Sequence, residues 1–251
     1  MTTSGASAQP LPIRSYRHRR GRLSATTADA LDRLGDLLLT VDGLPLDPTA
    51  LFGRASPLVL EIGCGMGEAT AAMAEADPDR DLLAIDVHVQ GLGRLLRHIE
   101  GAGLTNVRVL EGDAVVLLTE MLAPDSLDEV RVYFPDPWPK SRHHKRRLVQ
   151  PSFLDLVGTR LRPGGTLHLA TDWAPYAEQV SALLRDHPGY MVTHEGGRPA
   201  HRPVTRFEQR GLDAGRPSYD LLARRDSALR GCHEWQPLLH INNVKDCDNN
   251  S

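Results

Sequence analysis

The chain has 251 residues and a formal net charge of −3, with 29 lysines and arginines against 32 aspartates and glutamates. This length is enough for one sizeable α/β domain, and the charge excludes a protein that is basic over its whole surface. No apolar run approaches the roughly 18 residues of a membrane span, and the N-terminus lacks a signal-peptide core, so we expect a cytoplasmic protein with no membrane partner. The three cysteines form no CxxC pair, which favours a reducing compartment, and we expect no metal.

The hydrophobic pattern predicts alternating strands and helices behind a mobile polar tail at residues 1–13. Strands are expected at 57–62, 81–87, 106–113, 128–134 and 166–172, with two short closing strands at 190–195 and 218–225. Helices are expected at 27–39, 66–76, 92–101, 114–122, 151–161 and 177–186. Such alternation is typical of an α/β fold with a doubly wound, mostly parallel, Rossmann-like sheet. We therefore expect one domain at 14–225 and a disordered tail at 226–251.

Basic residues gather in two short segments, although the chain as a whole is acidic. RSYRHRRGR at 14–22 carries five arginines, and RHHKRR at 142–147 carries four cations and two histidines. Local clusters of this kind suit a phosphate backbone that is bound at one face of the protein. The alternative for each is a solvated charge run or a basic tail without a partner.

A glycine turn follows the strand predicted at 57–62. The apolar run carries Glu61 near its end and continues into three alternating glycines that begin with Gly63 and Gly65. Glycines let the backbone approach a nucleotide, but Glu68 stands where the dinucleotide pattern G-x-G-x-x-G has its last glycine. Two carboxylates beside the turn would repel a pyrophosphate and suit a cationic nucleoside. The turn therefore predicts S-adenosylmethionine as the cofactor and disfavours NAD.

Each later strand of the predicted parallel sheet is followed by an acid. Asp86 closes the second strand, Asp113 the third and Asp172 the fifth, and Asp136 follows the fourth. In open α/β sheets, ligands bind at this edge. Asp86 is placed to accept both ribose hydroxyls, and either Asp113 or its neighbour Ala114 would meet the adenine. Any one of these acids has the alternative role of capping a helix, but four in succession favour a shared site.

The loop YFPDPWPK at 133–140 brings together a carboxylate (Asp136), an aromatic ring (Trp138) and an ammonium (Lys140). Its alternating prolines fix φ and remove amide donors, so the segment leaves the strand as a stiff loop. Beside a run of cations, this combination suits a pocket for a flat, hydrogen-bonding base. Trp138 either stacks on that base or packs in the core. The alternative for the whole segment is a proline-rich turn without a ligand.

These motifs resemble the bacterial tRNA (guanine-N7)-methyltransferase family, which acts on guanine 46 in the variable loop of tRNA. The matching stretches are RSYRHRRGRL (14–23), LEIGCGMGEAT (60–70), IDVHVQGLGRLL (85–96), VRVLEGDA (107–114), YFPDPWPKSRHHKRRLVQPSFLDLV (133–157), LRPGGTLHLATDW (161–173) and TRFEQRGLDAG (205–215). FPDPWPK with HHKRR and TRFE form the most specific set. The resemblance implies a class I methyltransferase fold, S-adenosylmethionine as methyl donor and tRNA as substrate. The oligomeric state, monomer or homodimer, stays open.

The resemblance also assigns roles to residues of this chain. It implies a donor site formed by Glu61, Asp86, Asp113 and Asp136, with Asp136 as the catalytic acid too. It implies substrate-binding positions at Lys140, Asp172, Thr205, Arg206, Phe207 and Glu208. It implies RNA contacts at Arg142, His143, His144, Lys145, Arg146 and Arg147.

The chemistry of guanine then suggests a mechanism. N7 has a free lone pair and no proton, so methyl transfer needs alignment and acids that favour a cationic purine rather than a base. We expect Asp136 and Glu208 to accept hydrogen bonds from guanine N1–H and N2–H₂, and Lys140 to contact O6 or a phosphate. The N7 edge is often used in tRNA tertiary pairing, so the base is expected to be extracted into the pocket.

The sequence departs from the family pattern at two places, and two alternative functions stay open. Strand two ends in Asp86 where the family has glutamate, and residues 89–90 replace a polar-Pro pair. The proline loop also resembles the Asp-Pro-Pro-aromatic loop of methyltransferases that act on amino groups of DNA, protein or small molecules. A non-catalytic RNA-binding module with the same fold is the second alternative.

Overall fold

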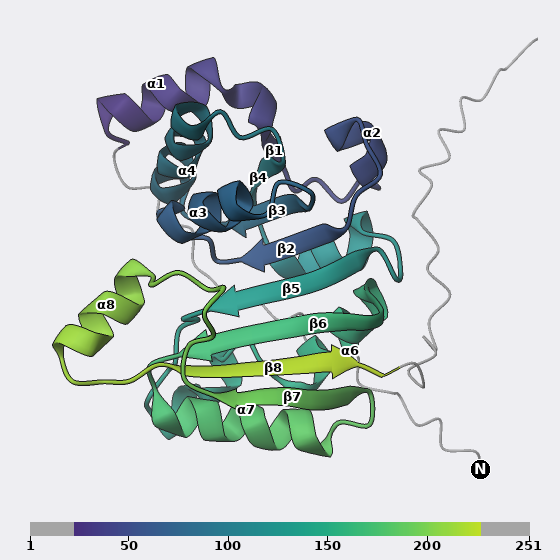
Figure 1. Cartoon of the computed structure of the whole chain (residues 1–251), viewed down its shortest axis with the longest axis vertical. Coiled ribbons are helices and arrows are strands. Elements are labelled where there is room, and N and C mark those ends of the chain that lie inside the picture. Colours follow the sequence, from purple (N-terminus) through teal and green to yellow (C-terminus); the bar gives the residue numbers. More distant parts are fainter. Residues whose placement is uncertain (1–22, 227–251) are drawn as a thin grey trace, which may run out of the picture.

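The computed structural model describes residues 23–226. The tail predicted at 1–13, the basic cluster at 14–22 and residues 227–251 lie outside the described part of the chain. The described strands are β1 (Leu38–Thr40), β2 (Leu58–Ile62), β3 (Asp81–Asp86), β4 (Val107–Glu111), β5 (Leu127–Tyr133), β6 (Leu161–Thr171), β7 (Tyr190–Gly196) and β8 (Tyr219–Arg225). They form one sheet in the order β1-β4-β3-β2-β5-β6-β8-β7, in which β8 runs antiparallel to β6 and β7 and the other neighbouring strands are parallel (Figure 1). The predicted doubly wound, mostly parallel sheet is confirmed.

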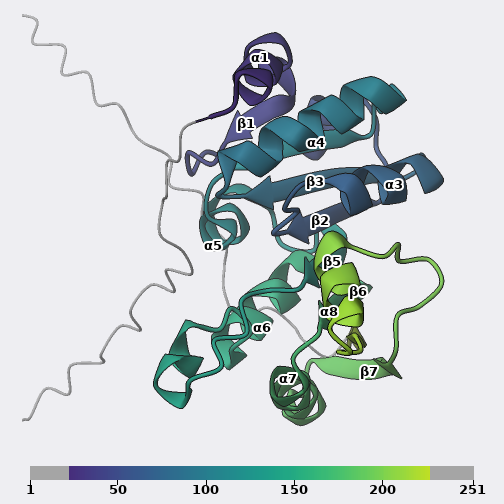
Figure 2. The same cartoon turned by 90° about the vertical axis from the view of Figure 1, so that its left-hand side faces the viewer.

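Helices lie on both faces of this sheet. On one face, α1 (Ala25–Arg33), α3 (Glu68–Ala76) and α4 (Val89–Ala102) lie over β1 to β4, and α6 (Pro151–Arg160) and α7 (Ala174–Asp186) lie on the other (Figures 1 and 2). Alternate residues of each strand face the two layers. Val59 and Ala84 therefore belong to the core under α3 and α4, whereas Leu60 and Val130 belong to the core with α6 and α7.

The part of the sheet formed by β5, β6 and β8 differs from the rest on the face that carries α3. Among the described elements, no helix lies over β6 and β8 on that face (Figure 1). The strands present polar side chains there: Glu129, Arg131 and Tyr133 from β5, His168 from β6 and Asp220 from β8, all of them buried. Buried polar groups need partners, so hydrogen bonds and ion pairs hold this face together, beside a small apolar cluster of Met73, Tyr133 and Ala170.

The helix predicted at 27–39 is shorter than expected. α1 ends at Arg33, a 3₁₀ turn follows at Gly35–Leu37, and β1 begins at Leu38. The leucines of this segment do pack on the core beside α4, but Leu38 also pairs in parallel with Val109. The free edge of β4 therefore offers backbone partners that override the helical spacing.

Two further boundaries differ from the prediction. The helix at 114–122 is a short α5 (Ala114–Val116) continued by a π-helical turn, Leu117–Met121. The chain enters β6 directly at Leu161, which pairs with Leu127, and the Pro-Gly-Gly segment forms a register shift inside that strand. Besides β1 and the 3₁₀ turn before it, three elements were not predicted: α2 (Pro48–Phe52), the 3₁₀ helix η3 (Ser141–Arg146) and α8 (Arg206–Asp213).

Candidate active site

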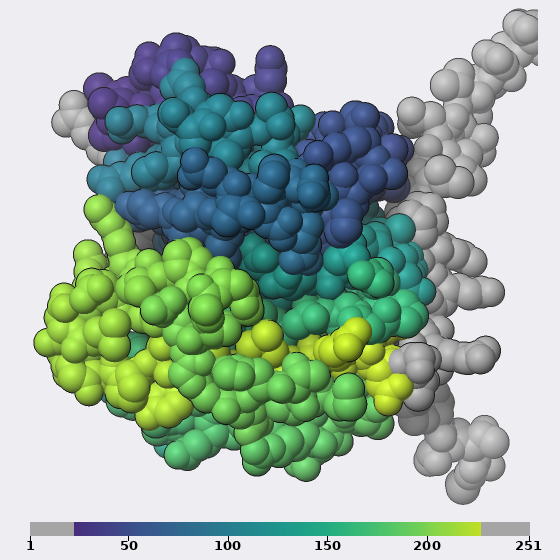
Figure 3. All heavy atoms as spheres, viewed as in Figure 1, coloured from purple at the N-terminus to yellow at the C-terminus, as the bar shows by residue number. Residues whose placement is uncertain are grey.

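A cavity of about 550 Å³ opens at the carboxyl ends of β2, β3 and β5. Its walls are the glycine turn before α3, the proline loop after β5 and the beginning of α8. In Figure 3 the α8 segment, in yellow-green, faces the blue α3–α4 half of the molecule. The predicted site residues that line the cavity are Glu61, Gly63, Gly65, Asp86, Ala114, Asp136, Arg146, Thr205, Arg206 and Phe207. This volume and position suit a small organic ligand in an open α/β sheet.

The glycine turn forms the first wall of this cavity. Gly63, Gly65 and Gly67 have φ values of 81°, 57° and 81°, which are left-handed conformations that favour glycine. Helix α4 packs so closely that a Cβ atom on Gly91 would lie 2.0 Å from the Gly65 carbonyl oxygen. A Cβ atom on Gly63 or Gly65 would meet no atom within 4 Å. The turn is thus fixed from behind and leaves its backbone open toward a ligand.

Asp86 fastens the turn to the end of β3. Its Oδ2 accepts a hydrogen bond from Gly65 N at 2.9 Å, and its Oδ1 accepts from Val87 N at 2.7 Å and His88 N at 2.9 Å. A carboxylate offers about four lone-pair positions, and three are used here. The remaining position is on Oδ2, so Asp86 has room for one ribose hydroxyl rather than the predicted two.

Glu61 is a buried acid in the wall of the same cavity. Burial raises the pKa of its carboxyl group to about 7, although nearby Arg131 acts in the opposite direction. Its Oε2 atom is buried without a hydrogen-bond partner among the described residues. A buried acceptor of this kind invites a ligand that brings positive charge or a donor. The observation fits S-adenosylmethionine, which carries a sulfonium and an ammonium group.

The proline loop forms the second wall. Phe134 and Trp138 have φ values of 52° and 41°, which are uncommon for residues with bulky side chains and fix the path of the loop. Asp136 is exposed at the cavity. The Trp138 ring lines the cavity and carries the Arg146 guanidinium 5.0 Å from its centroid. The tryptophan is therefore half-buried at the wall, neither in the core nor free in solvent.

The cationic run forms η3, next to the loop. Lys140, Arg142, Lys145 and Arg146 are exposed, whereas His143 and His144 are half-buried. Of these predicted substrate and RNA contacts, only Arg146 lines the cavity. The others therefore lie outside the cavity, where a nucleic-acid backbone rather than a bound base can reach them.

Arg147 differs from the prediction. Its side chain is 2% exposed, donates to Pro137 O at 2.8 Å and to Gln179, and stacks over Tyr176 at 4.8 Å. It cannot reach a phosphate from this position. Arg147 instead ties the proline loop to α7, which corrects its assignment as an RNA contact.

The third wall is the N-terminus of α8. Thr205 caps the helix by accepting a hydrogen bond from Glu208 N at 3.1 Å. Arg206 pairs with Glu68 across the cavity at 3.1 Å, and the Phe207 ring is 58% exposed. Glu208 departs from the prediction, because its side chain is 2% exposed and binds Arg202 rather than facing the cavity. A direct contact between Glu208 and guanine does not fit this position.

Asp113 and Asp172 lie outside the cavity lining. Asp113 caps α5 by accepting from Val115 N at 2.8 Å, whereas its neighbour Ala114 lines the cavity, which favours the second of the two predicted adenine contacts. Asp172 is a quarter exposed and accepts from Arg216 at 2.9 Å. Here Asp172 fastens the segment after α8 to the end of β6.

Comparison with known proteins places this site in a family. Residues 55–221 match a family model described as "Putative methyltransferase". A tRNA (guanine-N(7)-)-methyltransferase of Streptomyces avermitilis is 59% identical over 218 residues, which are 85% of this chain and 75% of that protein. The protein of the same name from Nitrosospira multiformis is 48% identical over 85% of this chain and 95% of its own length. The chain belongs to the tRNA (guanine-N7)-methyltransferase family.

Solved structures place the fold of this family member among methyltransferases. The 16S rRNA methyltransferase KamB aligns with a TM-score of 0.53 at 15% identity and covers 70% of this chain and 91% of its own. A protein described as an antibiotic-related methyltransferase aligns with a TM-score of 0.52 at 17% identity over 72% of this chain and 96% of its own. At such identities the likeness concerns the fold alone, and it confirms the predicted class I methyltransferase architecture.

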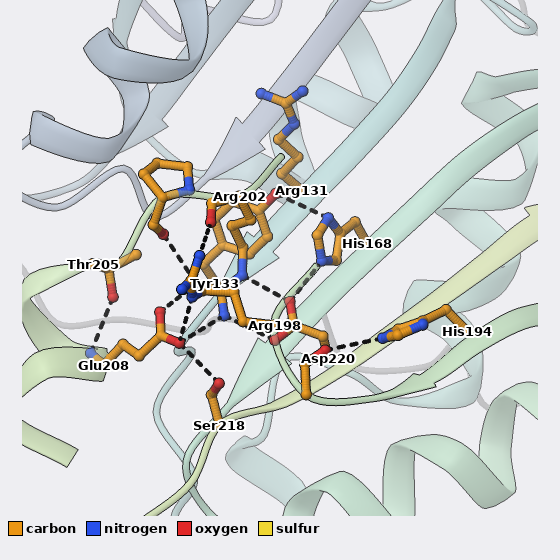
Figure 4. Close-up of polar contacts among 12 residues, drawn as sticks. Arg131, Tyr133, His168, His194, Arg198, Arg202, Thr205, Glu208, Ser218 and Asp220 are labelled. Carbon is orange, nitrogen blue, oxygen red and sulfur yellow. Dashed lines mark hydrogen bonds and ion pairs between the residues drawn. The ribbon is translucent and has the colours of Figure 1, made fainter. Parts of the chain in front are cut away.

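A buried polar network lies behind α8, and the sequence did not predict it. Figure 4 shows its main members, Tyr133, His168, Arg202, Glu208 and Asp220. They come from β5, β6 and β8, from α8 and from the segment that leads into α8. The sequence did contain a signal, because charged or polar residues alternate with apolar ones inside DEVRVYF and TLHLATD. Only the fold shows that these residues meet.

Residues 23–226 lack two other kinds of feature. No group of three or more His, Cys, Asp or Glu side chains in this range is arranged to hold a metal ion. Within the same range, every helix is too short or too polar to cross a membrane. The cytoplasmic location stays a prediction.

Proposed function

We propose that this chain transfers a methyl group from S-adenosylmethionine to N7 of a guanine in tRNA, namely guanine 46 of the variable loop. The observation that carries the proposal is the cavity itself, in which a buried carboxyl group with one unpartnered oxygen and a glycine turn lie opposite a proline loop and Arg146. The names of its relatives support guanine N7 in tRNA as the target. Position 46 and the donor rest on the resemblance and on the chemistry of the site.

The donor half of the cavity supplies binding and charge. The open backbone at Gly63 and Gly65 admits the nucleoside, and the one remaining acceptor position of Asp86 takes a ribose hydroxyl. Ala114 lies where the adenine meets the wall. Glu61 offers its unpartnered oxygen to a cationic group of the methionine part. When bound, S-adenosylmethionine supplies an electrophilic methyl group.

The substrate half orients the nucleophile. Guanine N7 needs no base, so the residues of this half act by holding the ring in line with the methyl group. Asp136 accepts hydrogen bonds from the N1–H and N2–H₂ edge and favours the cationic product by its negative charge. Trp138 and Phe207 offer aromatic faces from two different walls of the cavity. Lys140 and the exposed cations of η3 bind phosphates, since they lie outside the cavity.

The experiment is mass spectrometry of nucleosides from tRNA that has been incubated with the protein and a methyl-labelled donor. We expect labelled N7-methylguanosine, and cleavage of the product strand at this alkali-labile base maps its position. Label in another guanine atom, or in protein or free nucleoside instead of tRNA, would contradict the proposal and favour one of the other methyltransferase classes. Label at a guanine other than 46 would support the proposed reaction and contradict only the proposed position.

A further inference from the structure

Arg202 is the centre of the buried network behind α8. Its side chain has 0% exposure and lies between two carboxylates. It donates to Asp220 through Nε at 2.7 Å and Nη2 at 2.8 Å, and to Glu208 through Nη1 at 2.7 Å and Nη2 at 3.2 Å (Figure 4). Paired hydrogen bonds from one guanidinium to two carboxylates fix both the distance and the orientation of those carboxylates. Arg202 therefore joins α8, which carries Glu208, to β8, which carries Asp220.

The same network reaches β5 through His168. Burial would raise the pKa of Asp220, but hydrogen bonds from His168 and Arg202 outweigh it and keep that pKa below its usual range. Burial lowers the pKa of His168, so the ring is neutral. The ionised Asp220 must accept, so His168 donates from Nε2 at 2.8 Å and accepts the Tyr133 hydroxyl at Nδ1, at 3.0 Å. This order of donors ties the last residue of β5 to β8.

Arg202 also contacts the start of the proline loop. Its guanidinium carbon lies 5.4 Å from the centroid of the Tyr133 ring and 5.5 Å from that of the Phe134 ring. Phe134 has a left-handed φ and lines the cavity two residues before Asp136. A single buried arginine thus contacts both walls of the substrate half, although it does not itself line the cavity.

We propose that Arg202 is a positioning residue for the tRNA base, acting through Glu208 and Phe134 to hold α8 and the proline loop at a fixed separation. The proposal rests on the proposed function. It gives Glu208 a role that its burial permits. The Glu208 carboxylate binds Arg202, and this ion pair holds α8, which presents Arg206 and Phe207, in place. The glycine turn and Asp86 do not belong to this network, so binding of the methyl donor alone is independent of it.

The test compares Arg202→Lys, Glu208→Gln and the double variant in single-turnover methylation of tRNA over a range of tRNA concentrations. Lysine keeps the charge but loses the fork that joins two carboxylates. We expect each single variant to raise the half-saturating tRNA concentration about tenfold and to leave the dissociation constant of S-adenosylmethionine within about twofold. We expect the double variant to be no worse than Arg202→Lys, because residues that act as one unit are not additive.

Arg160→Lys is the matched control. Arg160 is also a buried arginine, and it donates to backbone carbonyls of Leu118 and Thr119, away from the cavity. It should lower thermal stability without changing half-saturation by tRNA. If Arg202→Lys behaves like this control, Arg202 only supports the fold and the proposal is overturned.

Other results of the same experiment also bear on the proposal. If Arg202→Lys does not fold, Glu208→Gln alone must show the raised half-saturation with normal donor binding, and normal half-saturation overturns the proposal. Losses from the two single variants that add in the double variant would show that Arg202 and Glu208 act independently, which overturns the proposal. If the unaltered protein binds donor but methylates no tRNA, the proposed function fails, and that result is separate from any difference between variants.

Discussion

The two halves of the cavity are held in shape by different kinds of interaction. In the donor half, Asp86 accepts hydrogen bonds from three backbone amides, and helix packing fixes the glycine turn. In the substrate half, the buried guanidinium groups of Arg147 and Arg202 bridge separate elements, mostly through other side chains. Backbone contacts preserve a ligand site under many substitutions, whereas a buried arginine loses its function when either partner changes. The donor half should therefore tolerate more substitutions, whereas the shape of the substrate half depends on single side chains.

Charge separates the two halves as well. Glu61, Glu68 and Asp86 give the donor half its acids, and Arg146 and Arg206 give the substrate half its cations, beside one acid, Asp136. This division suits a cationic cofactor on one side and a polyanionic substrate on the other. Four predictions test this comparison.

The largest expected effect concerns Glu61 and pH. Its pKa is raised to about 7 in the folded protein from a usual value of 4.5, so its contribution to stability is present below about pH 4.5 and is lost as pH rises through 7. A shift of this size corresponds to about 3 kcal/mol. The free energy of unfolding of Glu61→Gln, relative to the unaltered protein, should therefore rise by about that amount between pH 4 and pH 8 in urea titrations.

Donor binding provides an independent check on Glu61. A cation placed near the carboxyl group favours its ionised form, so donor binding near pH 7 should release protons. Calorimetry in buffers of different ionisation enthalpy measures this release, which Glu61→Gln should abolish. A stability difference that does not vary with pH, together with no proton release, would remove Glu61 from the donor site.

The next effect concerns Asp136 in the substrate half. Asn keeps the shape but replaces one acceptor with a donor that faces the guanine donors. Loss of one charge-assisted hydrogen bond lowers turnover by roughly 10- to 150-fold. Asp136 is exposed, so the melting temperature should stay unchanged. Single-turnover methylation and melting are measured on one preparation, and a folded, fully active Asp136→Asn would exclude the residue from the mechanism.

A smaller effect, of about tenfold on donor affinity, is expected for Gly91→Ala. The new Cβ atom would lie 2.0 Å from the Gly65 carbonyl oxygen, so the glycine turn must move. Gly101→Ala is the matched control, because it lies in the same helix with no atom within 4 Å and should stabilise the protein by about 0.5–1 kcal/mol. Donor titrations that show equal affinity for both variants would contradict the packing described for the turn.

The smallest effect separates Arg146 from Arg147. Arg146→Ala removes an exposed cation, so the slope of log affinity for tRNA against log salt should flatten by about 0.7–0.9. Arg147→Ala should leave that slope unchanged and lower the melting temperature, because its side chain is buried against the proline loop and α7. If Arg147→Ala flattens the slope as much as Arg146→Ala does, Arg147 reaches the phosphate backbone after all.

The comparison also explains what the sequence revealed. The glycine turn and the acids at strand ends follow from local rules about strands and turns, and Glu61, Asp86 and Ala114 indeed line the cavity. Nothing local distinguishes Arg147 from Arg146, since the two are adjacent and only the position of α7 decides which is buried. The same holds for Glu208, whose direction is set by Arg202 and by Asp220, a residue of another strand. Long-range pairs of this kind need the fold.

The position of β8 determines when the site can become complete. This strand is the last described element of the chain, yet it is inserted between β6 and β7 and carries Asp220 into the interior. A nascent chain that ends before β8 already contains the glycine turn, Asp86 and the whole proline loop. It lacks the carboxylate that orders His168 and Arg202, so the arginine that contacts both substrate walls is not fixed in place. During synthesis, the pocket for the methyl donor can form early, whereas the site for the base is assembled only when β8 enters the sheet.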